Sequence, residues 1–109
     1  MIGITDEDKE KIIAWASERR AVRRVYLFGS RARGNHRPDS DVDLAIEMLG
    51  KNLEARYGSW MFWDDENKKG RRLILPYPVQ LEWYDPEDVT LEIVGPAVRT
   101  DGILVYERV

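Results

Sequence analysis

The chain has no cysteine and only one histidine, and both absences limit its chemistry. Without cysteine, structural disulfides, thiolate catalysis and cysteine-bound zinc are excluded, and a reducing cytoplasm is the compartment that we expect. With His36 alone, no metal site can be built from several histidines. Any metal would therefore be held by carboxylates, which favour hard ions such as magnesium or manganese.

Long apolar runs are also missing. No stretch approaches the ~20 apolar residues that span a bilayer, and residues 1–11 are charged where a signal peptide would be apolar. We therefore expect neither a membrane segment nor a secretory signal. The 109 residues are 43% hydrophobic and 34% charged, which excludes a weakly hydrophobic disordered chain. At this length we expect residues 1–109 to form a single domain.

The charge balance disfavours a general nucleic-acid binder. There are 17 basic and 20 acidic residues, for a net charge of −3, whereas such binders are usually basic. The distribution is more informative, because 12 of the basic residues are arginines and seven of these fall between positions 19 and 37. The planar arginine side chain suits phosphate recognition. For the arginines at 19–24, a solvated charged face is the simpler interpretation.

Local patterns predict alternating helices and strands. Apolar spacing predicts helices at 5–20, 52–67 and 95–102, the second interrupted at Gly58-Ser59. Clusters of β-branched and aromatic residues, or alternation of polar and apolar ones, predict strands at 22–28, 41–48, 73–75, 79–84 and 103–106. The residues expected on or near the apolar face of the first helix are Ile12, Ile13, Trp15 and Ala16. Residues 31–40 and 85–88 are expected to be turns.

The stretch from Gly29 to Ile46, GSRARGNHRPDSDVDLAI, carries the chemistry. Glycine lets a backbone approach a ligand closely, and the Ser30 hydroxyl and the amides after it can donate to a phosphate. A short helix beginning near Ser30 would add positive potential there. A strand followed by Gly-Ser and a turn is common, so this feature alone indicates little.

Two aspartates in the following strand strengthen the interpretation. Asp41 and Asp43 are two residues apart, so their side chains project from one face of the strand. Two such carboxylates repel each other unless a cation lies between them, which is the arrangement that a hard divalent ion needs. The apolar residues Val42, Leu44 and Ile46 would point to the opposite face, into the core. For an isolated Asp-x-Asp, an edge strand with a solvated acidic face is the alternative.

Taken together, these residues resemble the DNA polymerase β superfamily of nucleotidyltransferases, whose signature is Gly-Ser, ten residues, then Asp-x-Asp. The fuller string from Gly29 to Leu44 is similar to the minimal nucleotidyltransferases (MNT), including the MNT partners of HEPN-domain proteins in toxin–antitoxin pairs. The resemblance implies an α+β fold, a small mixed β-sheet with helices mainly on one face.

The resemblance also implies a reaction. A nucleoside monophosphate, AMP from ATP, would move to an acceptor hydroxyl on a partner protein with a HEPN domain. Asp41 and Asp43 would hold Mg²⁺ (or Mn²⁺), and Gly29 and Ser30 would contact the β- and γ-phosphates. Arg33, rather than Arg31, is the expected triphosphate contact. Nucleic acid is expected only as an acceptor, and an oligomer is compatible with the sequence.

The family needs a third carboxylate on a neighbouring strand, and the sequence leaves two registers open. The family pattern places Gln80 at this position, and glutamine cannot take a proton or supply negative charge. Glu82 lies two residues further along and therefore on the same face. We take Glu82 as the working third catalytic and metal-binding carboxylate.

Two alternative functions remain. If Gln80 occupies the third position, the domain would bind a nucleotide or a HEPN-like partner without catalysis. Modification of a small molecule, such as antibiotic adenylylation, is a further alternative, although it usually needs another domain to hold the acceptor.

Other conspicuous residues have plain interpretations. His36 is expected to be exposed to solvent. The aromatic residues Trp60, Phe62 and Trp63 would form either a partner-binding patch or part of the core. The basic residues of the loop that follows would be solvated or would contact an acidic acceptor: Lys68, Lys69, Arg71 and Arg72.

Overall fold

The computed structural model describes residues 2–68 and 72–109, without the side chains of 63–68. The elements follow the order α1 (Asp6–Ser17), β1 (Val22–Phe28), α2 (Ser30–Arg33), β2 (Val42–Met48), α3 (Leu53–Lys68), β3 (Val79–Trp83), α4 (Val94–Asp101) and β4 (Ile103–Glu107). Within the described ranges, no helix combines the length and apolar character needed to cross a membrane.

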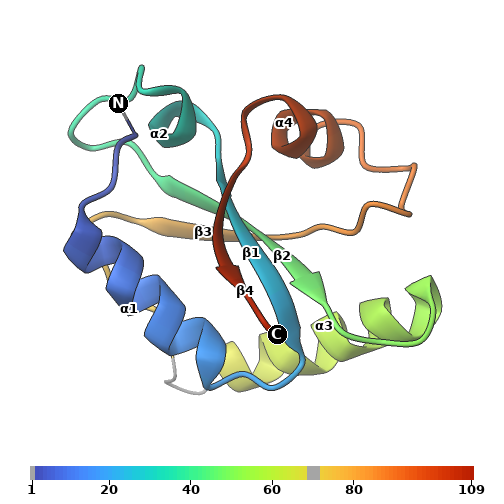
Figure 1. Ribbon diagram of the computed structural model, residues 1–109. Helices are drawn as coiled ribbons and strands as arrows, with labels where there is room; N and C mark the ends of the chain where they lie inside the picture. The colour runs from blue at the N-terminus through green and yellow to red at the C-terminus, as the bar shows by residue number, and fades with distance from the viewer. Residues whose placement is uncertain (1, 69–71) are drawn as a thin grey trace.

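The four strands form one mixed sheet with the order β3-β2-β1-β4. β1 is antiparallel to both β2 and β4, whereas β2 is parallel to β3. A parallel pair needs a crossover connection, and α3 provides it between β2 and β3. In Figure 1, α1 and α3 lie along the lower side of the sheet, and α2 and α4 lie together above it. The expected α+β class with a small mixed sheet is confirmed.

The larger core fills the space between the sheet and the two long helices. Val42, Leu44 and Ile46 are fully buried there with Ile12 of α1, and Leu53 of α3 packs against the same cluster. The opposite face of the sheet has a smaller cluster, in which Val98 of α4 packs with strand residues that include Phe28 and Ala45. The prediction that the apolar residues of β2 point into the core is therefore confirmed.

Three local predictions were wrong. α3 continues through Gly58-Ser59 without a break, and the rings of Tyr57 and Trp60, on either side of Gly58, pack on Trp83 with centroids 5.1 and 6.4 Å from its ring. Residues 73–75 form no strand, and the apolar character of Leu75 reflects burial rather than pairing. Ile13, expected near the apolar face of α1, is 39% exposed.

A buried ion pair fixes α3 to the turn after β3. Arg56 Nε lies 2.5 Å from Asp85 Oδ2, and the two side chains are only 10% and 1% exposed. Arg56 NH1 also donates to the Gly50 carbonyl at 3.2 Å, and Asp85 Oδ1 accepts the Glu87 amide at 2.9 Å. This pair holds the crossover helix against β3 and so supports the parallel pairing of β2 with β3.

Replacing one partner of this pair should destabilise the fold. Asp85→Ala leaves a buried guanidinium without its carboxylate and should lower the free energy of unfolding by about 3 kcal/mol. Urea denaturation at neutral pH measures the change. Glu87→Gln is the matched control: it removes a contact of Arg56 with a side chain that is 68% exposed. The control should cost less than about 1 kcal/mol, and equal losses in both variants would contradict the assignment.

Candidate functional site

The predicted site residues meet where β1 ends and β2 begins. Phe28, the last residue of β1, is the partner of Asp43 in the antiparallel register, and Asp41 immediately precedes β2. On its other side, Asp43 pairs with Gln80 of β3. Asp43 therefore lies on an inner strand of the sheet, at the end where Figure 1 shows α2 and α4.

Gly29 makes the turn out of β1 and comes closest to Asp43. Its φ of +78° is left-handed, which favours glycine, and a Cβ at this position would collide with Asp43 Oδ2. The Gly29 carbonyl accepts the amides of Ala32 and Arg33 at 3.1 and 3.2 Å. The short helix expected near Ser30 is therefore present as α2, and the backbone passes next to a carboxylate with no side chain between them.

Burial and neighbouring charges raise the pKa of the Asp43 carboxyl above the ordinary value of 3.8. Burial is the largest cause, followed by the negative charges of Asp41 and Glu82, while the positive charge of Arg33 acts in the opposite direction. Asp41, Glu82 and Arg33 are thus all close enough to influence Asp43. A cation placed here would relieve the repulsion among the carboxylates.

The register of β3 clarifies the two candidates for the third carboxylate. Gln80 is the direct partner of Asp43, and Glu82 is the partner of Ala45. Because residues paired in this way share a face of the sheet, both side chains lie on the Asp43 face, and both residues are exposed. The glutamine is therefore the nearer of the two in register, and the glutamate acts on Asp43 through its charge.

The carboxylates fit a metal that also binds a phosphate. Among the described residues, no group of three or more His, Cys, Asp or Glu side chains is arranged to hold a metal ion. Magnesium, however, is commonly bound through one or two carboxylates together with substrate phosphates. Asp41 and Asp43, which repel each other beside a closely approaching backbone, are suited to this kind of shared site.

The two arginines of α2 have different surroundings. Arg31 is 2% exposed and donates to the carbonyls of Gly3, Ser40 and Pro38 at 2.7, 2.9 and 3.0 Å. It therefore holds the loop that leads back to β2 and is not available to a triphosphate. Arg33 is 43% exposed in its side chain and lies 3.8 Å from Asp101 Oδ2. No local pattern indicates the role of Arg31, since its acceptors are backbone carbonyls from separate segments.

The exposure of His36 differs from the expectation. Its ring packs so closely on Gly3 that a Cβ there would lie 2.5 Å from the ring, and its Nδ1 is buried without a hydrogen-bond partner in the described part of the chain. It is partly buried rather than exposed to solvent. The expectation failed because the N-terminal segment, which is distant in sequence, covers the loop.

The aromatic residues of α3 divide between core and surface. Trp60 is partly buried against the core, whereas Phe62 is 83% exposed. The side chains of Trp63 and Lys68, and residues Lys69 and Arg71 entirely, lie outside the described part of the chain. Arg72 is described and exposed.

The raised pKa of Asp43 predicts a stability change with pH. The unfolded chain releases the Asp43 proton at lower pH than the folded chain, so stability is lost as pH rises from about 3.8 through the raised pKa. Asp43→Asn should therefore increase the free energy of unfolding at pH 7, and the gain should vanish in acid below that window. Urea denaturation at both pH values measures it. Asp39→Asn, on the exposed loop, is the control, and a destabilised Asp43→Asn at pH 7 would contradict the prediction.

Comparison with solved structures identifies the same fold elsewhere. The chain is similar to a crystal structure of a toxin–antitoxin with AMP-PNP, with a TM-score of 0.55 and 19% identity over 92% of this chain and 73% of that one. The structure of a mutant of the toxin–antitoxin MntA-HpeT matches with a TM-score of 0.55, 19% identity and the same coverage. At such identity the likeness establishes the fold alone.

Comparison of the sequence itself places the chain in a family. No curated protein matches it significantly. Residues 10–95, which include the Gly-Ser turn, both aspartates and β3, match the family described as Polymerase beta, Nucleotidyltransferase. The chain belongs to the polymerase β nucleotidyltransferase family.

Proposed function

We propose that the chain is a metal-dependent nucleotidyltransferase that moves AMP from ATP to a hydroxyl group on a partner protein. The observation that carries the proposal is the close approach of the Gly29 backbone to Asp43, a carboxylate whose pKa is raised beside Asp41. This arrangement suits a cation and a phosphate bound together. Family membership supports the general reaction class.

The nucleotide would bind over the turn from β1 into α2. Gly29 lets the backbone lie close to Asp43, and the Ser30 hydroxyl can donate to the β- or γ-phosphate. Arg33 would add a positive charge on the same side, because its charge already reaches Asp43 and its side chain is 43% exposed. Leaving its ion pair with Asp101 would cost little, since the pair is solvated and its atoms are 3.8 Å apart.

Asp41 and Asp43 would hold the Mg²⁺ or Mn²⁺, which supplies charge neutralisation for the phosphates when bound. The acceptor oxygen forms a bond to the α-phosphorus while the bond to the pyrophosphate oxygen breaks, and pyrophosphate leaves. Glu82 would take the proton of the acceptor hydroxyl, because it is the remaining carboxylate whose charge reaches Asp43. Positioning and charge neutralisation account for most of the expected catalysis.

A protein acceptor is favoured by the structural comparisons. Two of the similar structures are described as toxin–antitoxin structures, one of them with AMP-PNP, an analogue of ATP. We propose by extension that ATP is the donor and that the acceptor is a HEPN-domain protein.

A second candidate function is favoured by β3. Gln80 is the direct partner of Asp43, and it can neither accept a proton nor add negative charge. If catalysis depends on that position, the domain binds a nucleotide or a partner protein without transferring AMP.

Label transfer from ATP labelled at the α-phosphate separates these functions. The purified chain is incubated with Mg²⁺ or Mn²⁺, with and without a HEPN-domain protein as the candidate acceptor. We expect label on the partner, abolished by Asp43→Asn. Glu82→Gln should slow transfer about 100-fold or more, as loss of a general base does.

Gln80→Leu is the matched control for Glu82→Gln. It alters the same exposed face of β3 and should retain transfer if Glu82 is the base. If the parent binds ATP but transfers no label, and Glu82→Gln binds ATP equally well, the catalytic proposal is wrong and the non-catalytic function replaces it. Absence of ATP binding would contradict both nucleotide-dependent functions and leave binding of a partner protein alone.

A further inference from the structure

A groove lies at the opposite end of the sheet from the candidate site. It has a volume of about 950 Å³ and lies between the C-terminal half of α1, the middle of α3 and residues 72–74. Arg20, on its wall, comes just before β1, whereas Gly29 comes just after it. At about 3.3 Å per residue, the seven residues of β1 separate the two places by roughly 20 Å.

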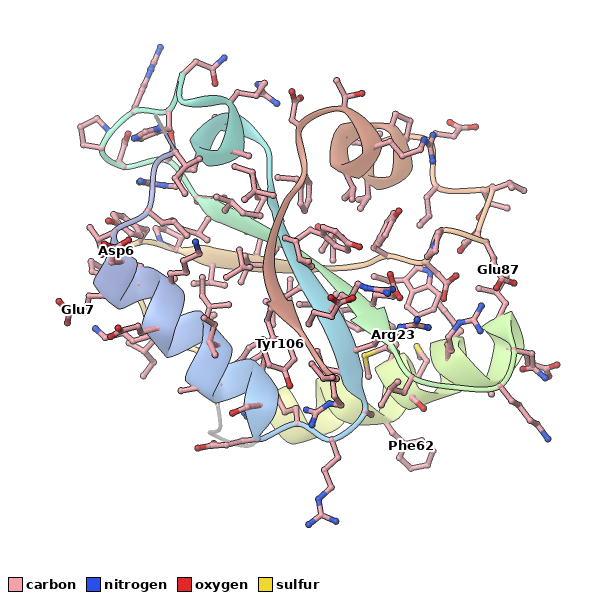
Figure 2. The ribbon with its side chains drawn as sticks, in the orientation of Figure 1. Asp6, Glu7, Arg23, Phe62, Glu87 and Tyr106 are labelled. Carbon is pink, nitrogen blue, oxygen red and sulfur yellow. The ribbon has the colours of Figure 1, made fainter. Side chains whose placement is uncertain are left out.

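Two of the large apolar side chains that line the groove are exposed to solvent. Phe62 is 83% exposed and Ile74 is 78% exposed, and both belong to the lining. Figure 2 shows the Phe62 side chain projecting from α3, away from the sheet. Leu73, beside Ile74, is partly buried against the core. Exposed apolar side chains that converge on one hollow are typical of contact surfaces.

The charged residues of the lining are mostly basic. Among the residues that the structure describes, the lining has four cations and one carboxylate, although the whole chain has a net charge of −3. The five are Lys11, Glu18, Arg19, Arg20 and Arg72. Within the part of the chain that the structure describes, neither Arg20 nor Arg72 has an ion-pair partner, and both residues are exposed. The groove is therefore a local positive region of an acidic protein.

We propose that this groove binds an acidic segment of a partner protein, with apolar side chains of the segment seated against Phe62 and Ile74. The basic residues of the groove would pair with the carboxylates of the segment. Phe62 and Ile74 would bury apolar surface against it, which a purely electrostatic contact would not do. A protein is favoured over nucleic acid because the chain as a whole is acidic and the exposed wall includes the aliphatic Ile74. Because the groove and the candidate site lie at opposite ends of β1, the two can be occupied together.

Fluorescence anisotropy with the full chain tests the proposal without reference to nucleotide transfer. The probe is a fluorescein-labelled amphipathic peptide with leucines on one face and glutamates on the other. We expect it to bind, to bind more weakly as salt increases, and to lose affinity when its glutamates are replaced by glutamine. Arg20→Glu with Arg72→Glu should weaken binding about tenfold or more, and so should Phe62→Asp.

Lys51→Glu is the control and makes the same charge change as either arginine substitution alone; Lys51 is exposed and does not line the groove. It should change the affinity less than about twofold, and circular dichroism should show that every variant is folded. Failure of the peptide to bind, or equal losses in Lys51→Glu and the groove variants, would overturn the proposal. Displacement of the peptide by a single-stranded oligonucleotide of higher affinity would overturn it in favour of nucleic acid.

Discussion

The close approach of the Gly29 backbone to the Asp43 carboxylate is the constraint on which the rest of the site depends. A Cβ at Gly29 would collide with Asp43 Oδ2, and the positive φ of Gly29 turns the chain from β1 directly into α2. That turn sends Arg33 toward Asp43 and Arg31 into the interior, where it holds the carbonyls of the loop returning to β2. One glycine thus joins the end of β1 to the carboxylates that begin β2.

The fold bears an electrostatic cost at this point. Burial and two neighbouring negative charges oppose ionisation of Asp43, so part of the stability of the chain is given up there at neutral pH. The ion pair of Arg56 with Asp85, by contrast, lies in the interior and fixes the strand that carries Gln80 and Glu82. This electrostatic cost lies at the end of the sheet that carries the candidate site, as is common where a ligand completes a site.

The sequence predicted what local patterns determine. β1 begins and ends at the expected residues, and Gly29 lies against Asp43, two residues that the family resemblance assigned to one site. The inward position of Arg31 could not be predicted, because its acceptors come from the N-terminal segment and a loop. Likewise, the pairing of Gln80 with Asp43 depends on a parallel register that a long crossover helix sets, and no local pattern encodes it.

Binding of Mn²⁺, followed by electron paramagnetic resonance with and without a non-hydrolysable ATP analogue, tests the central claim most directly. If Asp41 and Asp43 form half of a site that triphosphate oxygens complete, Mn²⁺ should bind tightly only with the analogue present. Asp43→Asn should abolish that binding while the chain stays folded. Equal binding of Mn²⁺ by the parent and by Asp43→Asn in the presence of the analogue would contradict the account.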